Sequence, residues 1–64
     1  MAQFLSEYVD ANKMARVIFE GGVYGCTFFV DGAEVKQEMY PGKSEAWAED
    51  AAENYVLGVK QLLI

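Results

Sequence analysis

Two residue pairs, Gly21-Gly22 and Asp31-Gly32, constrain the fold of this chain more than any other feature. Both favour two-residue β-hairpin turns of type I′, because that turn needs a positive φ at each of its two central residues. The runs beside them are rich in β-branched and aromatic residues, as strands are. A third break, Pro41-Gly42, follows the last run. We therefore predict a three-stranded antiparallel meander whose strands are residues 14–20, 23–30 and 33–40.

The two turns also predict how the strands pair. A two-residue loop at Asp31-Gly32 sets Cys26 opposite Gln37, and a two-residue loop at Gly21-Gly22 sets Val17 opposite Cys26. Both hairpins then gather apolar side chains on one face, and a slip of one residue would scatter them. This predicted core face holds Ala15, Val17, Phe19, Tyr24, Cys26, Phe28, Val30, Ala33, Val35 and Met39, with Gln37 as its polar member.

The opposite face of the predicted sheet mixes polar and apolar residues. Its apolar members are Met14, Ile18, Val23, Phe29 and Tyr40. Scattered apolar side chains are normal on a protein surface, but this face carries more of them than we expect on a small monomer. We take Ile18, Phe29 and Tyr40 as candidate contacts with a partner or with a second copy of the chain.

The start of the chain predicts a short N-terminal helix at residues 2–11. Its apolar residues fall at helical spacing and form one stripe. They are Phe4, Leu5, Tyr8 and Val9. Asn12 is the expected end of this helix.

A long C-terminal helix is predicted at residues 44–63. Ser44 is a natural N-cap, and Glu45 and Lys60 complement the two ends of the helix dipole. The face toward the sheet is expected to hold Ala48, Ala51, Ala52, Tyr55, Val56, Val59, Leu62 and Leu63. The outer face is expected to hold Asp50, Glu53, Leu57, Lys60 and Gln61, with Trp47 at the edge of the stripe. The predicted fold class is α+β, in the order α-β-β-β-α, as one domain over residues 1–64.

Size and charge indicate the kind of partner. A domain of 64 residues buries only about 60% of its unfolded surface. Of its residues 53% are hydrophobic, above the roughly 45–50% of typical domains, so some apolar surface is expected to contact a partner. Ten acidic and five basic side chains give a net charge of −5, which repels nucleic acids and anionic membranes. A basic protein surface suits this charge better.

Catalytic and metal-binding chemistry is not expected. The chain has no histidine and one cysteine, Cys26, so a transition-metal site lacks its usual ligands. Cys26 falls on the predicted core face, where a thiol acts as a small apolar group. We expect no cofactor and no enzymatic activity. The single cysteine, the lack of a signal peptide and the lack of an apolar run of about 18 residues predict a cytoplasmic protein.

Residues 42–52, GKSEAWAEDAA, resemble the loop and helix start of double-stranded-RNA-binding domains. The similar positions are Gly42, Ser44, Ala48 and Ala51-Ala52. The predicted order α-β-β-β-α is also the layout of that family. The resemblance therefore implies a sheet with both helices on one face.

The same resemblance argues against RNA binding by this chain. In that family, lysines after the serine and one turn later contact RNA phosphates. The matching positions here are Glu45, Ala46 and Glu49, and a carboxylate beside a phosphate adds repulsion. The predicted loop Gly21-Gly22 is also too short to reach into a groove, as the loop between the first two strands does in the family.

These features lead to a non-catalytic protein-binding module as the predicted function, as a homodimer or as a subunit of a larger assembly. The chain also resembles, in size and charge, small acidic accessory proteins of phages, several of which bind and inhibit a host enzyme. The alternatives are a degenerate double-stranded-RNA-binding domain and an acidic mimic of nucleic acid.

The candidate contact residues fall in two sets. The candidate protein contacts are Trp47, Asp50, Leu57 and Gln61 on the helix and Ile18, Phe29 and Tyr40 on the sheet. An acidic patch at the helix start consists of Glu45, Glu49, Asp50 and Glu53. Trp47 is either an exposed interface anchor or a core residue at the sheet edge. The acidic patch either grips a basic surface or is a solvated helix face.

Overall fold

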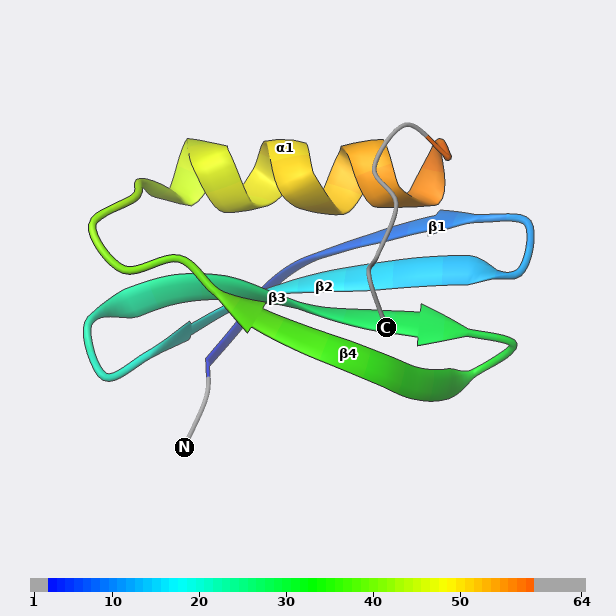
Figure 1. Cartoon of the computed structure of the whole chain (residues 1–64), viewed down its shortest axis with the longest axis horizontal. Coiled ribbons are helices and arrows are strands. Elements are labelled where there is room, and N and C mark those ends of the chain that lie inside the picture. The colour runs from blue at the N-terminus through cyan, green and yellow to red at the C-terminus, as the bar shows by residue number, and fades with distance from the viewer. Residues whose placement is uncertain (1–2, 59–64) are drawn as a thin grey trace.

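The computed structural model describes residues 3–58 and shows two layers, a four-stranded antiparallel sheet and one helix across it (Figure 1). The strands pair in chain order as a meander, with each strand beside the next. The elements are β1 (Gln3–Asp10), β2 (Lys13–Glu20), β3 (Val23–Val30), β4 (Ala33–Met39) and α1 (Glu45–Val56). The order is therefore β-β-β-β-α.

The predicted N-terminal helix at residues 2–11 is wrong, because residues 3–10 form strand β1. β1 pairs with β2 through a two-residue turn at Ala11 and Asn12. A register shift between Phe4 and Ser6 leaves Leu5 as an extra residue in β1. Such a β-bulge breaks the two-residue alternation of a strand, so the apolar residues fall at a spacing that imitates a helix.

The predicted register of the central hairpin is confirmed. Val17 pairs with Cys26, and Ala15 pairs with Phe28. Gly21 and Gly22 have φ of 59° and 81°, the positive values that a type I′ turn requires.

The predicted register of the last hairpin is wrong beyond its first pairs. Val30 pairs with Ala33 as expected, but a shift between Phe28 and Phe29 leaves Val35 as the extra residue of a second bulge. Cys26 then pairs with Glu38 instead of Gln37.

Gly25 explains why the shifted pairing of β3 with β4 is sterically possible. Gly25 pairs with Met39, and a Cβ added to Gly25 would lie 2.5 Å from the Met39 sulfur and 2.5 Å from the Glu38 carbonyl oxygen. Because Gly25 has no side chain, Met39 occupies that space on the sheet face away from α1. The bulge therefore moves Met39 off the predicted core face and brings Glu38 and Tyr40 to the α1 side.

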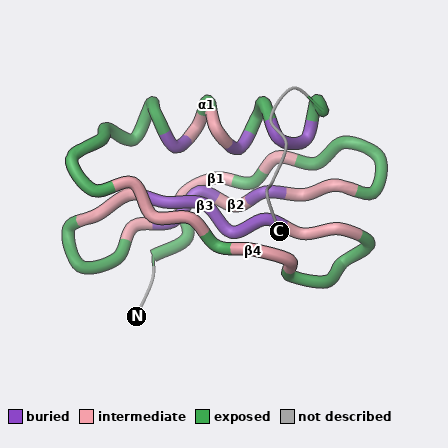
Figure 2. Tube along the Cα trace, in the orientation of Figure 1, coloured by how far each residue is buried: buried purple, intermediate pink, exposed green. Residues whose placement is uncertain are grey.

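The core lies between α1 and the centre of the sheet (Figure 2). Its buried residues are Ala15, Val17, Cys26, Phe28, Ala48, Ala52, Tyr55 and Val56. Ala48 and Ala52 let the helix backbone approach the strands closely, so that the Cys26 thiol donates to the Ala48 carbonyl at 3.1 Å. At the far end the Phe28 and Tyr55 rings lie 4.7 Å apart between centroids, a favourable distance for an aromatic pair.

The helix begins as predicted and ends earlier than predicted. The Ser44 side chain accepts a hydrogen bond from the Trp47 amide, as an N-cap does. α1 ends at Val56, and Gly58 follows with φ of 84°, the left-handed conformation that commonly closes a helix. The predicted helix members Val59, Leu62 and Leu63, and also Lys60, lie outside the described residues. Within the described part of the chain, no helix has the length and apolar character that a membrane crossing requires.

Candidate functional site

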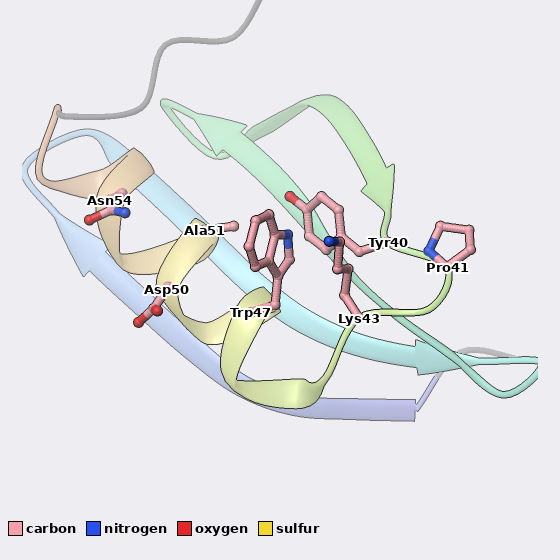
Figure 3. A pocket seen from close by; sticks show the side chains of 7 residues that line it. All are labelled: Tyr40, Pro41, Lys43, Trp47, Asp50, Ala51 and Asn54. Carbon is pink, nitrogen blue, oxygen red and sulfur yellow. The ribbon is translucent and has the colours of Figure 1, made fainter.

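α1 covers three of the four strands and leaves β4 open. It packs on β1, β2 and β3, and within residues 3–58 no Cα atom of α1 lies within 8 Å of a Cα atom of β4. β4 lies at one edge of the sheet. The fold leaves a groove between α1 and the segment that follows β4 (Figure 3).

Residues of α1 and of the segment after β4 line this groove (Figure 3). It has a volume of about 660 Å³. The lining residues are Tyr40, Pro41, Lys43, Trp47, Asp50, Ala51 and Asn54. We call this the Trp47 groove. Its size falls in the range of about 300–1,000 Å³ that binding pockets occupy.

Trp47 forms the α1 wall of the groove and is 51% exposed. Large aromatic side chains are usually buried, and their exposure in a groove is typical of binding surfaces. The Lys43 ammonium lies 4.5 Å from the centroid of the indole ring, within the distance of a cation–π interaction. The ring therefore already holds a cation that the chain itself supplies.

Tyr40 forms the opposite wall and is held in place by hydrogen bonds. Its hydroxyl donates to Glu38 Oε1 at 2.8 Å, and the other oxygen of Glu38 lies 3.6 Å from Lys36 Nζ. Burial, followed by the hydrogen bond to Glu38, raises the pKa of Tyr40 far above its usual value. The phenol therefore stays protonated and acts as a fixed donor and an apolar wall.

The bulge in β4 brings Tyr40 into this site. The sequence predicted Tyr40 on the outer sheet face, together with Ile18 and Phe29. Because the extra residue Val35 shifts the alternation, Tyr40 instead lines the groove with Trp47 and Asp50. The groove thus brings together Trp47 and Asp50, which were predicted contacts on the helix, and Tyr40, which was a predicted contact on the sheet.

The four acidic residues at the helix start differ in exposure. Glu45, Asp50 and Glu53 are exposed. Glu49 is partly buried against β1, where its carboxylate accepts hydrogen bonds from the Tyr8 hydroxyl and, at 2.7 Å, from Ser6 Oγ. The bond to Glu49, followed by burial, raises the pKa of Tyr8 to about 12. Glu49 therefore joins the helix to the sheet.

The other candidate contacts lie away from the groove. Ile18 is only 7% exposed and offers no contact surface. Phe29 lies under the Arg16 guanidinium at 5.3 Å from its ring centroid. Leu57 is 59% exposed at the end of α1 and does not line the groove. Gln61 lies outside the described residues.

Sequence reasoning missed four residues that line the groove. They are Pro41, Lys43, Ala51 and Asn54. Pro41 and Lys43 could have been found, because the turn after the last strand must bring the chain back to the helix beside Tyr40. Within residues 3–58, no three histidine, cysteine or acidic side chains are grouped closely enough to hold a metal ion.

The fold and the groove define a small β-β-β-β-α protein with one exposed tryptophan in an open groove at the edge of its sheet. No protein-family model, curated protein or solved structure matches the chain. The first strand replaces the first helix on which the layout of a double-stranded-RNA-binding domain depends. The resemblance of residues 42–52 to that family stays a prediction.

Proposed function

We propose that this chain is a non-catalytic protein-binding module that holds a segment of its partner in the Trp47 groove. The observation that carries the proposal is the half-exposed Trp47 facing Tyr40 across a groove of about 660 Å³. Exposed tryptophan and tyrosine are the residues on which binding energy concentrates. By occupying that segment, the module would modulate or inhibit its partner. The proposal places it in the cytoplasm, a compartment in which a thiol that forms no disulfide, such as Cys26, stays reduced.

Selection from a displayed library of random peptides tests this proposal. Peptides enriched on the wild-type protein are titrated against the wild type, Trp47→Ala and Leu57→Ala. Leu57 is the matched control, because it is a large exposed apolar residue of the helix end outside the groove. We expect Trp47→Ala to weaken binding at least about tenfold, as loss of a hot-spot residue does, and Leu57→Ala to change it less than about twofold.

Two results would overturn the proposal. One is that no peptide is enriched, and the other is that Trp47→Ala binds the enriched peptides as well as the wild type does.

Light scattering on the same samples tests whether the chain forms the homodimer that the sequence predicted. Titration with duplex RNA at low salt tests the nucleic-acid alternative, whose affinity would weaken with added salt.

A further inference from the structure

We propose, building on the proposed function, that the segment held in the Trp47 groove is a proline-rich peptide in the polyproline II conformation, with basic residues at its ends. Its prolines pack between Trp47 and Tyr40, and its carbonyl oxygens accept hydrogen bonds from the groove. The aromatic walls, the donors between them and the charge of α1 each support one part of this proposal.

The first support is the pair of aromatic walls. Trp47 is half-exposed on α1, and Tyr40 lies opposite with its hydroxyl held by Glu38 Oε1 at 2.8 Å. Pro41 continues the Tyr40 wall (Figure 3). Grooves lined by aromatic rings are the usual sites for proline-rich segments. Because a polyproline II helix is already extended before it binds, such a segment loses little conformational entropy in the groove.

The second support is the kind of polar group that lies between these walls. Figure 3 shows the indole nitrogen of Trp47 directed toward Tyr40, and the Lys43 ammonium lies 4.5 Å from the centroid of the indole ring. Both groups donate hydrogen bonds and accept none. The carboxylate and the amide that also line the groove lie apart from this place. Asp50 is directed away from Trp47, and Asn54 is about two turns farther along α1 (Figure 3).

A segment that enters a groove of donors must bring acceptors. Each proline has a carbonyl oxygen and no N–H, and a polyproline II helix has no internal hydrogen bonds, so its carbonyls are free. A β-strand brings an N–H with almost every carbonyl, and an N–H left unpaired in the groove costs binding energy. An α-helix has already used its carbonyls internally. Of these three conformations, polyproline II therefore fits the donors of the groove best.

The third support is the charge of the helix beside the groove. α1 carries four acidic residues, Glu45, Glu49, Asp50 and Glu53, and no basic one. Asp50 and Glu53 are exposed, so they can pair with a residue that lies outside the groove. A segment that leaves the groove across α1 is therefore bound more tightly if it carries arginine or lysine there. The net charge of −5 attracts the same segment at long range and repels a second copy of the chain.

The test uses synthetic peptides of nine residues, about 28 Å long as a polyproline II helix. The probe has prolines in its centre and arginines at both ends. One comparison peptide replaces the central prolines with alanine, and another replaces the arginines with glutamate. Isothermal titration calorimetry measures affinity. By NMR, the indole N–H resonance of Trp47, the single tryptophan of the chain, reports whether the peptide enters the groove.

We expect the proline peptide to bind and to shift the indole N–H resonance downfield, as a new hydrogen bond does. The alanine peptide should bind at least about tenfold more weakly, because its N–H groups lose water and its chain must be ordered. Trp47→Phe keeps an aromatic wall without the indole donor and should weaken the proline peptide about threefold or more. Leu57→Phe places the same residue outside the groove and should change affinity less than about twofold.

Paired substitutions test the charge. Asp50→Asn with Glu53→Gln should weaken the probe about threefold or more at low salt, where exposed pairs are least screened. Glu20→Gln with Glu34→Gln removes the same charge from exposed positions outside α1 and should weaken it less than about twofold. The glutamate peptide should bind at least about tenfold more weakly than the probe.

Four results contradict this inference. Equal affinity of the proline and alanine peptides keeps the groove but rejects the polyproline II segment. Unchanged affinity in Trp47→Phe shows that the indole N–H is not a donor to the peptide. Equal binding of the arginine and glutamate peptides rejects the basic ends. An indole resonance that shifts with protein concentration alone places a second copy in the groove. Failure of the proposed function is recognised separately, as binding that Trp47→Ala does not change.

Discussion

Glu49 shows how one side chain can decide whether a helix face is a binding surface or a structural contact. In the resemblance to double-stranded-RNA-binding domains, it stands where that family carries a lysine. Its carboxylate instead accepts hydrogen bonds from the hydroxyl groups of Ser6 and Tyr8. Hydrogen bonds to a charged group contribute more than neutral ones. We predict that Glu49→Gln lowers the free energy of unfolding by about 1–2 kcal/mol, measured by urea denaturation.

Glu53→Gln is the control for this substitution. Glu53 is exposed on the same helix and its charge also acts on Tyr8, so the change removes an equal charge but leaves the hydrogen bonds of Glu49 to β1 in place. A change of less than about 0.5 kcal/mol is expected there. If both variants lose the same stability, the hydrogen bonds to Glu49 are not what holds the helix to β1.

The raised pKa of Tyr8 predicts a loss of stability at alkaline pH. The folded chain loses this proton near pH 12, whereas the unfolded chain loses it near pH 10. The folded state therefore binds the proton more tightly, so the stabilisation is complete below about pH 10 and is lost as the pH rises toward 12.

Urea denaturation between about pH 9 and pH 11 measures this loss, with Tyr8→Phe as the comparison. The variant should lose less stability over that range than the wild type. Some loss should remain, because burial also raises the pKa of Tyr40 and Tyr55. Parallel curves for the two proteins would contradict the role of Tyr8.

At the scale of elements, β1 shows which part of the fold the sequence could predict. The two glycine-containing turns were recognisable because Gly21, Gly22 and Gly32 adopt a positive φ at no steric cost. The turn at Ala11 carries no such signal, since alanine adopts a φ of 55° only with strain. The bulge at Leu5 also hid the strand alternation. One sequence signal for this first hairpin remained. Its turn starts ten residues before the Gly21-Gly22 turn, which itself starts ten residues before the Asp31-Gly32 turn.

The strain at Ala11 predicts a stabilising substitution. Ala11→Gly should raise the free energy of unfolding by about 0.5–1 kcal/mol, because relief of the left-handed conformation exceeds the added entropy of the unfolded glycine. Thermal and urea unfolding measure it. Ala33→Gly, at the start of β4 without a positive φ, should instead destabilise by a similar amount. A loss of stability in both variants would show that Ala11 is not strained.

The second bulge explains why only part of the site could be predicted. Trp47 and Asp50 were predicted as contacts from the regular spacing of residues around a helix, and α1 keeps that spacing over its whole length. The side of the sheet that Tyr40 faces depends on the extra residue Val35. That bulge is set by how Met39 fits over Gly25, a contact between strands that turn patterns do not reveal.

At the scale of the whole molecule, the helix and the four strands of residues 3–58 show how unevenly α1 covers the sheet. The alanines of α1 let it lie close to β2 and β3, while Glu49 draws it toward β1. The uncovered edge at β4 follows from both effects. The candidate site is thus a consequence of where the helix is held, rather than of a separate insertion or loop.

The net charge of −5 predicts that added salt stabilises this fold. The molecule extends 30 × 22 × 21 Å, so in about 0.01 M salt, where the screening length is about 30 Å, all its charges interact. In about 0.15 M salt the length falls to about 8 Å, and mainly neighbouring charges interact. The ion pairs Glu7–Arg16 and Lys36–Glu38 are local and persist, whereas the long-range repulsion is removed.

We expect the free energy of unfolding to rise by on the order of 0.5 kcal/mol between these two salt concentrations, an effect the size of one exposed charge pair. Urea denaturation in sodium chloride measures it. Changing the exposed Glu20, Glu34 and Glu53 to glutamine removes three negative charges, from −5 to −2, and should flatten the response. A stability that falls with salt in the wild type would mean that attraction between charges outweighs repulsion in this fold, and it would weaken the case for a basic partner drawn by the field of the whole molecule.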